Sequence, residues 1–95
     1  MNSDQKEQQL LRGLVENDTK AIQTIYAGNF SLIQALVLNN NGSYDDARDI
    51  FQEAMVILYE KAKSSEFQLT CQLKTFLYAI SKRLWHKKLK HHGIF

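Results

Sequence analysis

The chain has 95 residues, enough for one small domain with a single hydrophobic core. A hydrophobic fraction of 44% argues against disorder, and the absence of proline with only four glycines favours helices over a turn-rich β-sheet. The single cysteine, Cys71, excludes a disulfide within the chain. The polar start lacks the apolar core of a secretion signal, and no apolar run approaches the length that crosses a bilayer. We therefore expect a cytoplasmic protein that does not enter a membrane.

Charge is distributed unevenly along the chain. Residues 1–70 contain six Lys and Arg against ten Asp and Glu, a net charge of −4. Residues 71–95 contain six Lys and Arg, three His and no acid, a net charge of +6 with the histidines neutral. Such asymmetry suggests two partners of opposite charge, one of them nucleic acid.

Two helices are expected in the N-terminal part of the chain. Residues 1–9 are polar and should fray, and a short helix should follow them. Asp18 offers an N-cap, with Thr19 as a second candidate, for a helix over residues 19–38. In this second helix Gly28 lowers helix stability by up to ~1 kcal/mol relative to alanine, and marks either a kink or a close helix contact.

For the first helix, the expected buried side is Leu10, Leu11, Leu14 and Val15.

A central helix is expected over residues 43–61, after a turn at residues 39–42 whose Asn and Gly residues adopt turn conformations at little cost. Ser43 suits the N-cap position, and Asp45 places negative charge at the positive end of the helix dipole. Apolar residues at three- and four-residue steps predict one buried stripe, and a different, largely acidic face lies outside it. The stripe is Ala47, Ile50, Phe51, Ala54, Ile57 and Leu58, and the acidic face is Asp49, Gln52, Glu53, Val56 and Glu60.

The run D-I-F-Q-E at residues 49–53 resembles the polymerase-binding helix of bacterial sigma factors, whose pattern is D-apolar-apolar-Q-E. The wider segment D-A-R-D-I-F-Q-E-A-M-V-I-L-Y-E-K is similar to the extracytoplasmic-function group of the sigma-70 family. The resemblance implies that this face binds a coiled coil of a large subunit of core RNA polymerase. The alternative, from the residues alone, is an ordinary solvated helix face. The polymerase-binding residues implied by the family pattern are Arg48, Asp49, Gln52, Glu53, Val56 and Tyr59.

A last helix is expected over residues 72–90. Lys and Arg neutralise phosphates and aromatic rings stack on bases, so their interleaving here suits single-stranded or melting DNA. The alternatives are an ordinary surface helix with a half-buried Trp, or a helix lying on an anionic membrane, which is disfavoured because the apolar stripe is needed to close the bundle. One face is predicted to carry Leu73, Phe76, Leu77, Ile80 and Leu84, and a second face Tyr78, Ser81, Lys82, Trp85 and Leu89.

The segment T-F-L-Y-A-I-S-K-R-L-W at residues 75–85 resembles the sigma-factor segment T-W-L-Y-R-I-A-R-N-L, which contacts the minus-ten promoter element and holds it open. Two positions depart from it: Phe76 replaces the usual tryptophan, and Arg83 replaces a base-reading asparagine. Residues 62–70 correspond to the family's specificity loop, which receives a flipped base, although a polar connector is the alternative. The implied DNA-binding residues are Ser64, Ser65, Phe67, Thr70, Lys74, Tyr78, Lys82, Arg83, His86 and Lys87.

The sequence therefore predicts an all-α fold, a compact bundle of about four helices of the sigma-factor region 2 type, spanning residues 1–95 as one domain. Members of the family usually carry a second DNA-binding domain, which we expect to be absent from this chain. Core RNA polymerase and partly single-stranded promoter DNA are the implied partners, with an anti-sigma factor as a further one. The alternative function is a small helical interaction module, either a polymerase-binding regulator or an anti-sigma decoy, that binds a protein and no promoter.

Enzymatic chemistry is not expected, because the sequence shows no nucleophile–base set, phosphate loop or apolar carboxylate pair. No cofactor is implied. The three histidines, His86, His91 and His92, invite a metal interpretation, but two of them are adjacent in sequence and no Cys-x-x-Cys or His-Glu-x-x-His spacing accompanies them. We expect neither a catalytic nor a metal site.

Overall fold

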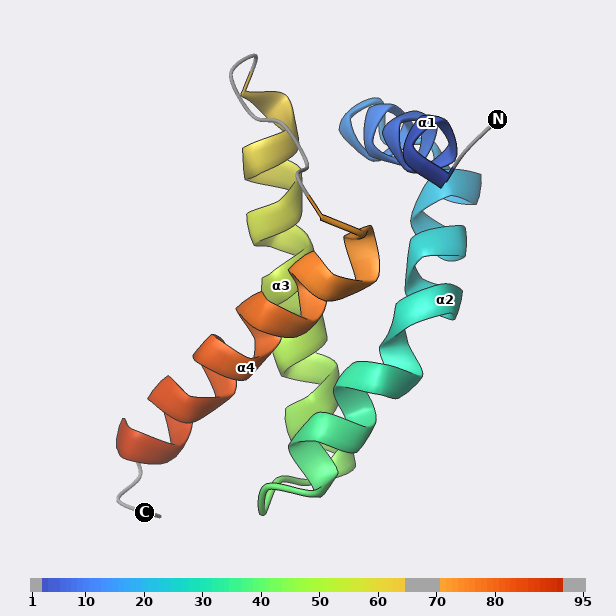
Figure 1. The fold of residues 1–95 in the computed structure, drawn as a ribbon. Coiled ribbons are helices and arrows are strands. Elements are labelled where there is room, and N and C mark those ends of the chain that lie inside the picture. Colours follow the sequence, from blue (N-terminus) through green and yellow to red (C-terminus); the bar gives the residue numbers. More distant parts are fainter. Residues whose placement is uncertain (1–2, 65–70, 92–95) are drawn as a thin grey trace.

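The computed structural model describes residues 3–64 and 71–91, and in these ranges all regular secondary structure is helical (Figure 1). The four helices are α1 (Ser3–Val15), α2 (Thr19–Leu38), α3 (Tyr44–Lys63) and α4 (Leu73–His91). Helix α4 crosses α3 at an angle, and α1 lies near the start of α2 at the same end of the molecule as the start of α4 (Figure 1). The expected all-α bundle is confirmed.

Local signals set the start of the two longest helices where the sequence predicted them. The Asp18 carboxylate accepts a hydrogen bond from the Lys20 backbone N–H (3.1 Å) and caps α2. Ser43 and Asp46 form a reciprocal capping box at the start of α3: the Asp46 N–H donates to Ser43 Oγ (3.1 Å) and the Ser43 N–H donates to Asp46 Oδ2 (2.9 Å). Asn41, with φ 72°, makes the left-handed step in the turn between the two helices.

Helix α1 begins earlier than expected. The polar residues assigned to a frayed start are helical from Ser3 onward. Most of these residues are Gln, Lys and Glu, which have good helix propensity. The helix is also anchored by Leu11 and Leu14, which are buried in the core, and by Glu7, whose carboxylate contacts α4. Tertiary packing therefore extends a helix that the local hydrophobic pattern predicts only over its C-terminal half.

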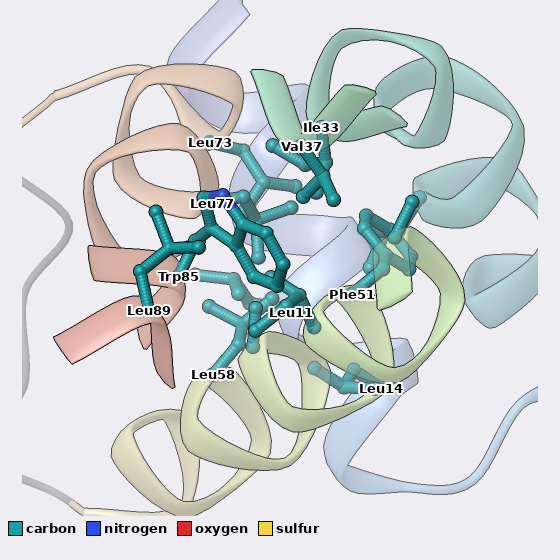
Figure 2. Packing of buried hydrophobic residues seen from close by; sticks show 14 residues of the cluster. Leu11, Leu14, Ile33, Val37, Phe51, Leu58, Leu73, Leu77, Trp85 and Leu89 are labelled. Carbon is teal, nitrogen blue, oxygen red and sulfur yellow. The ribbon is translucent and has the colours of Figure 1, made fainter. Parts of the chain in front are cut away.

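All four helices contribute to one hydrophobic core (Figure 2). In Figure 2 the labelled side chains converge from every element of the bundle, and Phe51 of α3 and Leu77 of α4 are completely buried. Phe51 also meets two rings of α2 edge-on, with centroid distances of 4.8 Å to Tyr26 and 5.5 Å to Phe30. Phe51 consequently fixes the rotation of α3 about its own axis relative to α2.

The face of α4 that enters the core differs from the predicted one. The buried residues recur at every fourth position, and three residues of the predicted stripe, Phe76, Ile80 and Leu84, are only partly buried. Four residues advance a helix slightly more than one full turn, so a four-residue stripe winds around the helix and suits an oblique crossing. Figure 1 shows such a crossing over α3. The buried residues of α4 are Leu73, Leu77, Ser81, Trp85 and Leu89.

The two central glycines have different environments. A Cβ at Gly42 would overlap Val37 Cγ1 and lie 2.7 Å from Trp85 Cζ2, so α4 approaches this turn too closely for a side chain. A Cβ at Gly28 would have no described atom of another element within 4 Å. The close helix contact considered for Gly28 is therefore not found among the described residues.

Helix α2 is long and apolar enough to span a membrane, the one such helix in the described part of the chain, which corrects the expectation that no apolar run is long enough. The core helix of a soluble bundle passes the same test. Here α2 contributes Ile25, Ile33 and Val37 to the shared core.

Candidate functional site

The outer face of α3 is formed by polar side chains around one exposed valine. Asp49, Gln52 and Glu53 are all exposed, while Ile50 and Phe51 beside them are completely buried. Steps of three and four residues relate these polar residues, so they share one side of the helix. The buried residues of α3 are those of the predicted stripe except Ile57, which is half-buried and lines a groove toward α4. Burial of the rest of the stripe turns the Asp-Gln-Glu set outward. We call Asp49, Gln52, Glu53 and Val56 the α3 outer face.

Val56 is 58% exposed, one of the few large apolar side chains that the described residues leave in solvent to this degree. It follows Gln52 by four residues and Glu53 by three, so it lies one turn further along the same side. A single apolar side chain surrounded by polar anchors is the arrangement expected of a small protein–protein contact.

Arg48 and Tyr59 flank the α3 outer face. The Arg48 guanidinium lies 3.7 Å from an Asp45 carboxylate oxygen, and because both side chains are largely exposed this pair contributes little stability. Tyr59 is half-buried and packs against the core, with Lys63 Nζ 5.3 Å from its ring centroid. Arg48 is thus more accessible to a partner than Tyr59.

The DNA-binding residues predicted on α4 divide between two sides of the helix. Lys74, Tyr78, Lys82 and His86 follow one another at four-residue steps and form one stripe, which we call the basic stripe. Tyr78 is half-buried and the other three are exposed. Arg83 lies elsewhere, lining a groove toward α3. Lys87, four residues after Arg83, continues that side of the helix.

The groove beside Arg83 runs between α3 and α4 and has a volume of about 290 Å³. Its walls are mainly apolar, and Lys61 and Arg83 supply two cations. Ile57 and Lys61 follow Glu53 at four-residue steps, so the groove lies next to the α3 outer face. A volume of this size suits one or two apolar side chains of a partner better than a cofactor. The lining residues are Ile57, Lys61, Phe76, Ala79, Ile80, Arg83 and Leu84.

Trp85 does not contribute to the exposed face of α4. It is 3% exposed, and its indole N–H donates to the Asn40 carbonyl oxygen at 2.9 Å. The prediction that placed Trp85 on one face with Lys82 is therefore wrong: Trp85 is buried with Ser81 and Leu89, whereas Lys82 is exposed. The alternative of a tryptophan packed toward the core is closer to the structure. A tryptophan in a basic helix suits base stacking, but here the ring fills the space above the glycine in the α2–α3 turn.

Helix α3 extends to Lys63, so the first two residues of the predicted specificity loop 62–70 are helical. Ser64 is exposed, and its backbone N–H donates to the Lys61 carbonyl oxygen (3.0 Å), which ends α3. The other predicted loop contacts, Ser65, Phe67 and Thr70, lie outside the described residues.

Two contacts that sequence reasoning missed join α4 to other elements. The Leu73 N–H, at the first residue of α4, donates to Glu7 Oε1 of α1 at 3.0 Å. Near the other end of the helix, Lys88 Nζ lies 3.9 Å from Asp46 Oδ1, the acidic member of the α3 capping box. Each contact links residues more than 40 positions apart, so no local pattern in the sequence points to it.

A metal site is not formed among residues 3–64 and 71–91, where no group of three His, Cys, Asp or Glu side chains is suitably placed. His86 and His91 are both exposed on α4, and His92 lies outside the described residues.

Comparison with known proteins assigns most of the chain to a family. The family model described as Sigma-70 region 2 matches residues 25–93, well over half of the chain. The match includes most of α2, all of α3 and all of α4, and leaves α1 outside it. No curated protein and no solved structure matches the chain.

Proposed function

Because the chain belongs to the Sigma-70 region 2 family, we propose that it binds core RNA polymerase through the α3 outer face and binds the minus-ten promoter element through α4. Family membership supports the general role in polymerase binding and promoter recognition. The assignment of each role to particular residues is our proposal.

One observation carries the polymerase role: Gln52 and Glu53 are exposed while their neighbours Ile50 and Phe51 are completely buried. A helix can bind a foreign helix only if a suitable face remains free after its own bundle has closed. The α3 outer face meets this requirement, with its exposed carboxylates and, one turn further along, the exposed Val56. We propose that this face contacts the coiled coil of a large polymerase subunit, with Arg48 and Tyr59 at its edge.

The DNA role is proposed for the basic stripe, with Arg83 and Lys87 on the adjoining side of α4. These cations can follow the phosphates of a single strand, and the half-buried ring of Tyr78 offers a surface for a base. We further propose that Ser64 and the loop that follows it contact a base released from the stack. Strand separation then needs no bond-making chemistry, because preferential binding of the unpaired state shifts the equilibrium toward it.

The sigma-factor resemblance also supports a proposal on the subgroup of the family and on the cellular location. The segment at residues 46–61 supports assignment to the extracytoplasmic-function group, and we propose a cytoplasmic location because core polymerase resides there.

A second candidate function is a helical module that binds a protein and no promoter. Its protein partner would be either core polymerase or an anti-sigma factor. The groove between α3 and α4 favours a protein partner, because its apolar wall contains Ile57, Phe76 and Ile80. The cations at Lys61 and Arg83 would suit an acidic partner.

Binding to a single-stranded minus-ten oligonucleotide separates the two functions. We expect the parent to bind it with a steep dependence on salt, and a Lys82→Gln/Arg83→Gln/Lys87→Gln variant to bind it much more weakly while keeping its affinity for core polymerase. If the parent binds polymerase but not the oligonucleotide, or if the triple variant binds the strand as well as the parent, the promoter role is wrong.

A further inference from the structure

Helix α1 reaches the first turn of α4 through one side chain. The Leu73 N–H donates to Glu7 Oε1 at 3.0 Å, across 66 positions of sequence. Glu7 is half-buried and Leu73 is 3% exposed, so the hydrogen bond lies partly out of solvent. Leu73 is the first residue of α4, and its N–H is one of the four that a helix start leaves without an intrahelical partner.

The first turn of α4 supplies no negative charge of its own to the helix N-terminus. The first turn of α4 contains no acidic residue, whereas α3 has Asp45 and Asp46 at the same place. A carboxylate at this end interacts favourably with the helix dipole and with the free N–H groups. Glu7 of α1 brings to the start of α4 the negative charge that Asp45 and Asp46 bring to the start of α3.

Glu7 is itself held in place by the packing of α1. Leu11 follows it by four residues and Leu14 by seven, so the three share one side of α1. Both leucines are buried in the same core cluster as Leu73 and Leu77 (Figure 2). The Glu7 carboxylate and the Leu73 amide are therefore held by helices that pack into the same core.

The first turn of α4 leads directly into the basic stripe. Lys74 follows Leu73 immediately, and Tyr78 lies one turn further on. We propose that Glu7 is a positioning residue for promoter binding: it holds the first turn of α4 in the helical conformation that presents Lys74 and Tyr78 to the DNA strand. This inference rests on the proposed function, and it assigns a role to α1, which lies before the matched residues 25–93.

The test uses the sign of the charge effect. Replacing Glu7 by alanine removes a negative charge from a protein that binds a polyanion, so electrostatics alone predicts tighter binding. If Glu7 positions α4, the Glu7→Ala variant binds the single-stranded minus-ten oligonucleotide about threefold to tenfold more weakly, because the strand must order a frayed first turn. Glu7→Gln keeps an acceptor oxygen and should retain most of the affinity.

The matched control is Glu16→Ala, which removes an exposed acid between α1 and α2. It should leave strand affinity unchanged or slightly raised. Affinity for core polymerase should be equal in the parent and in all three variants, because none of them alters the α3 outer face.

Hydrogen exchange of the Leu73 amide tests the contact without DNA. Protection of this amide should fall in Glu7→Ala and persist in Glu16→Ala. Unchanged protection in Glu7→Ala overturns the inference, and so does lost protection with unchanged or tighter strand binding. If the parent protein itself fails to bind the strand, the proposed promoter function is wrong and the positioning role falls with it, whereas the exchange result still decides whether Glu7 caps α4.

Discussion

The indole N–H of Trp85 donates a hydrogen bond to the backbone carbonyl oxygen of Asn40 at 2.9 Å. This contact fastens α4 to the turn that leads into α3. Close packing of the indole over Gly42 and the ion pair of Lys88 with Asp46 reinforce the same junction. The two helices proposed to bind different partners are thus joined both by core packing and by polar contacts at one end of the bundle.

Replacing Trp85 by phenylalanine should destabilise the fold without changing the charge of α4. The substitution removes the donor to Asn40 and leaves a gap beside Gly42, so we expect the free energy of unfolding to fall by about 2 kcal/mol. Urea denaturation followed by circular dichroism measures this change. A loss below ~0.5 kcal/mol, the usual range of a surface substitution, would show that the contact is not structurally important.

The two glycines of contrasting environment should respond oppositely to alanine. At Gly28 the methyl group enters open space within a helix, so Gly28→Ala should raise stability by about 0.5–1 kcal/mol. At Gly42 the same methyl group overlaps Val37 and crowds Trp85, so Gly42→Ala should lower stability by about 1–3 kcal/mol. Thermal unfolding of both variants beside the parent checks the pair. Shifts in the same direction would contradict the packing described for the turn.

Ser81 is completely buried, and its Oγ has no hydrogen-bond partner among the described residues. Burying an unpaired hydroxyl is unfavourable, and alanine has the higher helix propensity. Ser81→Ala should therefore raise the free energy of unfolding by about 1 kcal/mol. Ser31→Ala, at an exposed position of α2, provides the control for propensity alone and should gain less. A Ser81→Ala variant less stable than the parent would indicate that the hydroxyl is satisfied in solution.

Sequence patterns anticipated α2 and α3 well because each has one dominant signal. Asp18 and Ser43 are strong N-caps, and the apolar positions of α3 occupy one narrow stripe, so its rotation and its outer face follow from spacing alone. Helix α4 has apolar residues on most sides, and spacing could not decide whether Ile80 or Ser81 enters the core. Ser81 and Trp85 are buried because α4 crosses α3 obliquely and therefore buries every fourth residue.

Long-range contacts were beyond the reach of local patterns. Nothing near Glu7 distinguishes it from the exposed acids of the chain, and its role depends on where the start of α4 lies in space. The same holds for Lys88, which looked like one more basic residue of the last helix but pairs with the capping-box residue Asp46.

The two sides of α4 should differ in how they affect DNA binding. Each phosphate contact to a single strand contributes about 0.7 to the slope of log K against log salt concentration. Lys82→Gln should flatten this slope by about that amount, because Lys82 lies in the middle of the basic stripe. Arg83→Gln should flatten it less, because Arg83 lines the groove toward α3. Fluorescence anisotropy with a labelled minus-ten oligonucleotide at several salt concentrations gives both slopes, and a larger effect of Arg83 would place the strand on the groove side.

The account depends most on the outward face of α3, and the affinity for core RNA polymerase tests that face directly. We expect a Gln52→Ala/Glu53→Ala variant to bind core polymerase at least about thirtyfold more weakly than the parent, as for central interface residues, with unchanged stability and unchanged binding of the single strand. Glu16→Ala, which removes an exposed acid far from this face in sequence, should bind polymerase like the parent. Equal affinity of the double variant and the parent would contradict the assignment of this face to the polymerase.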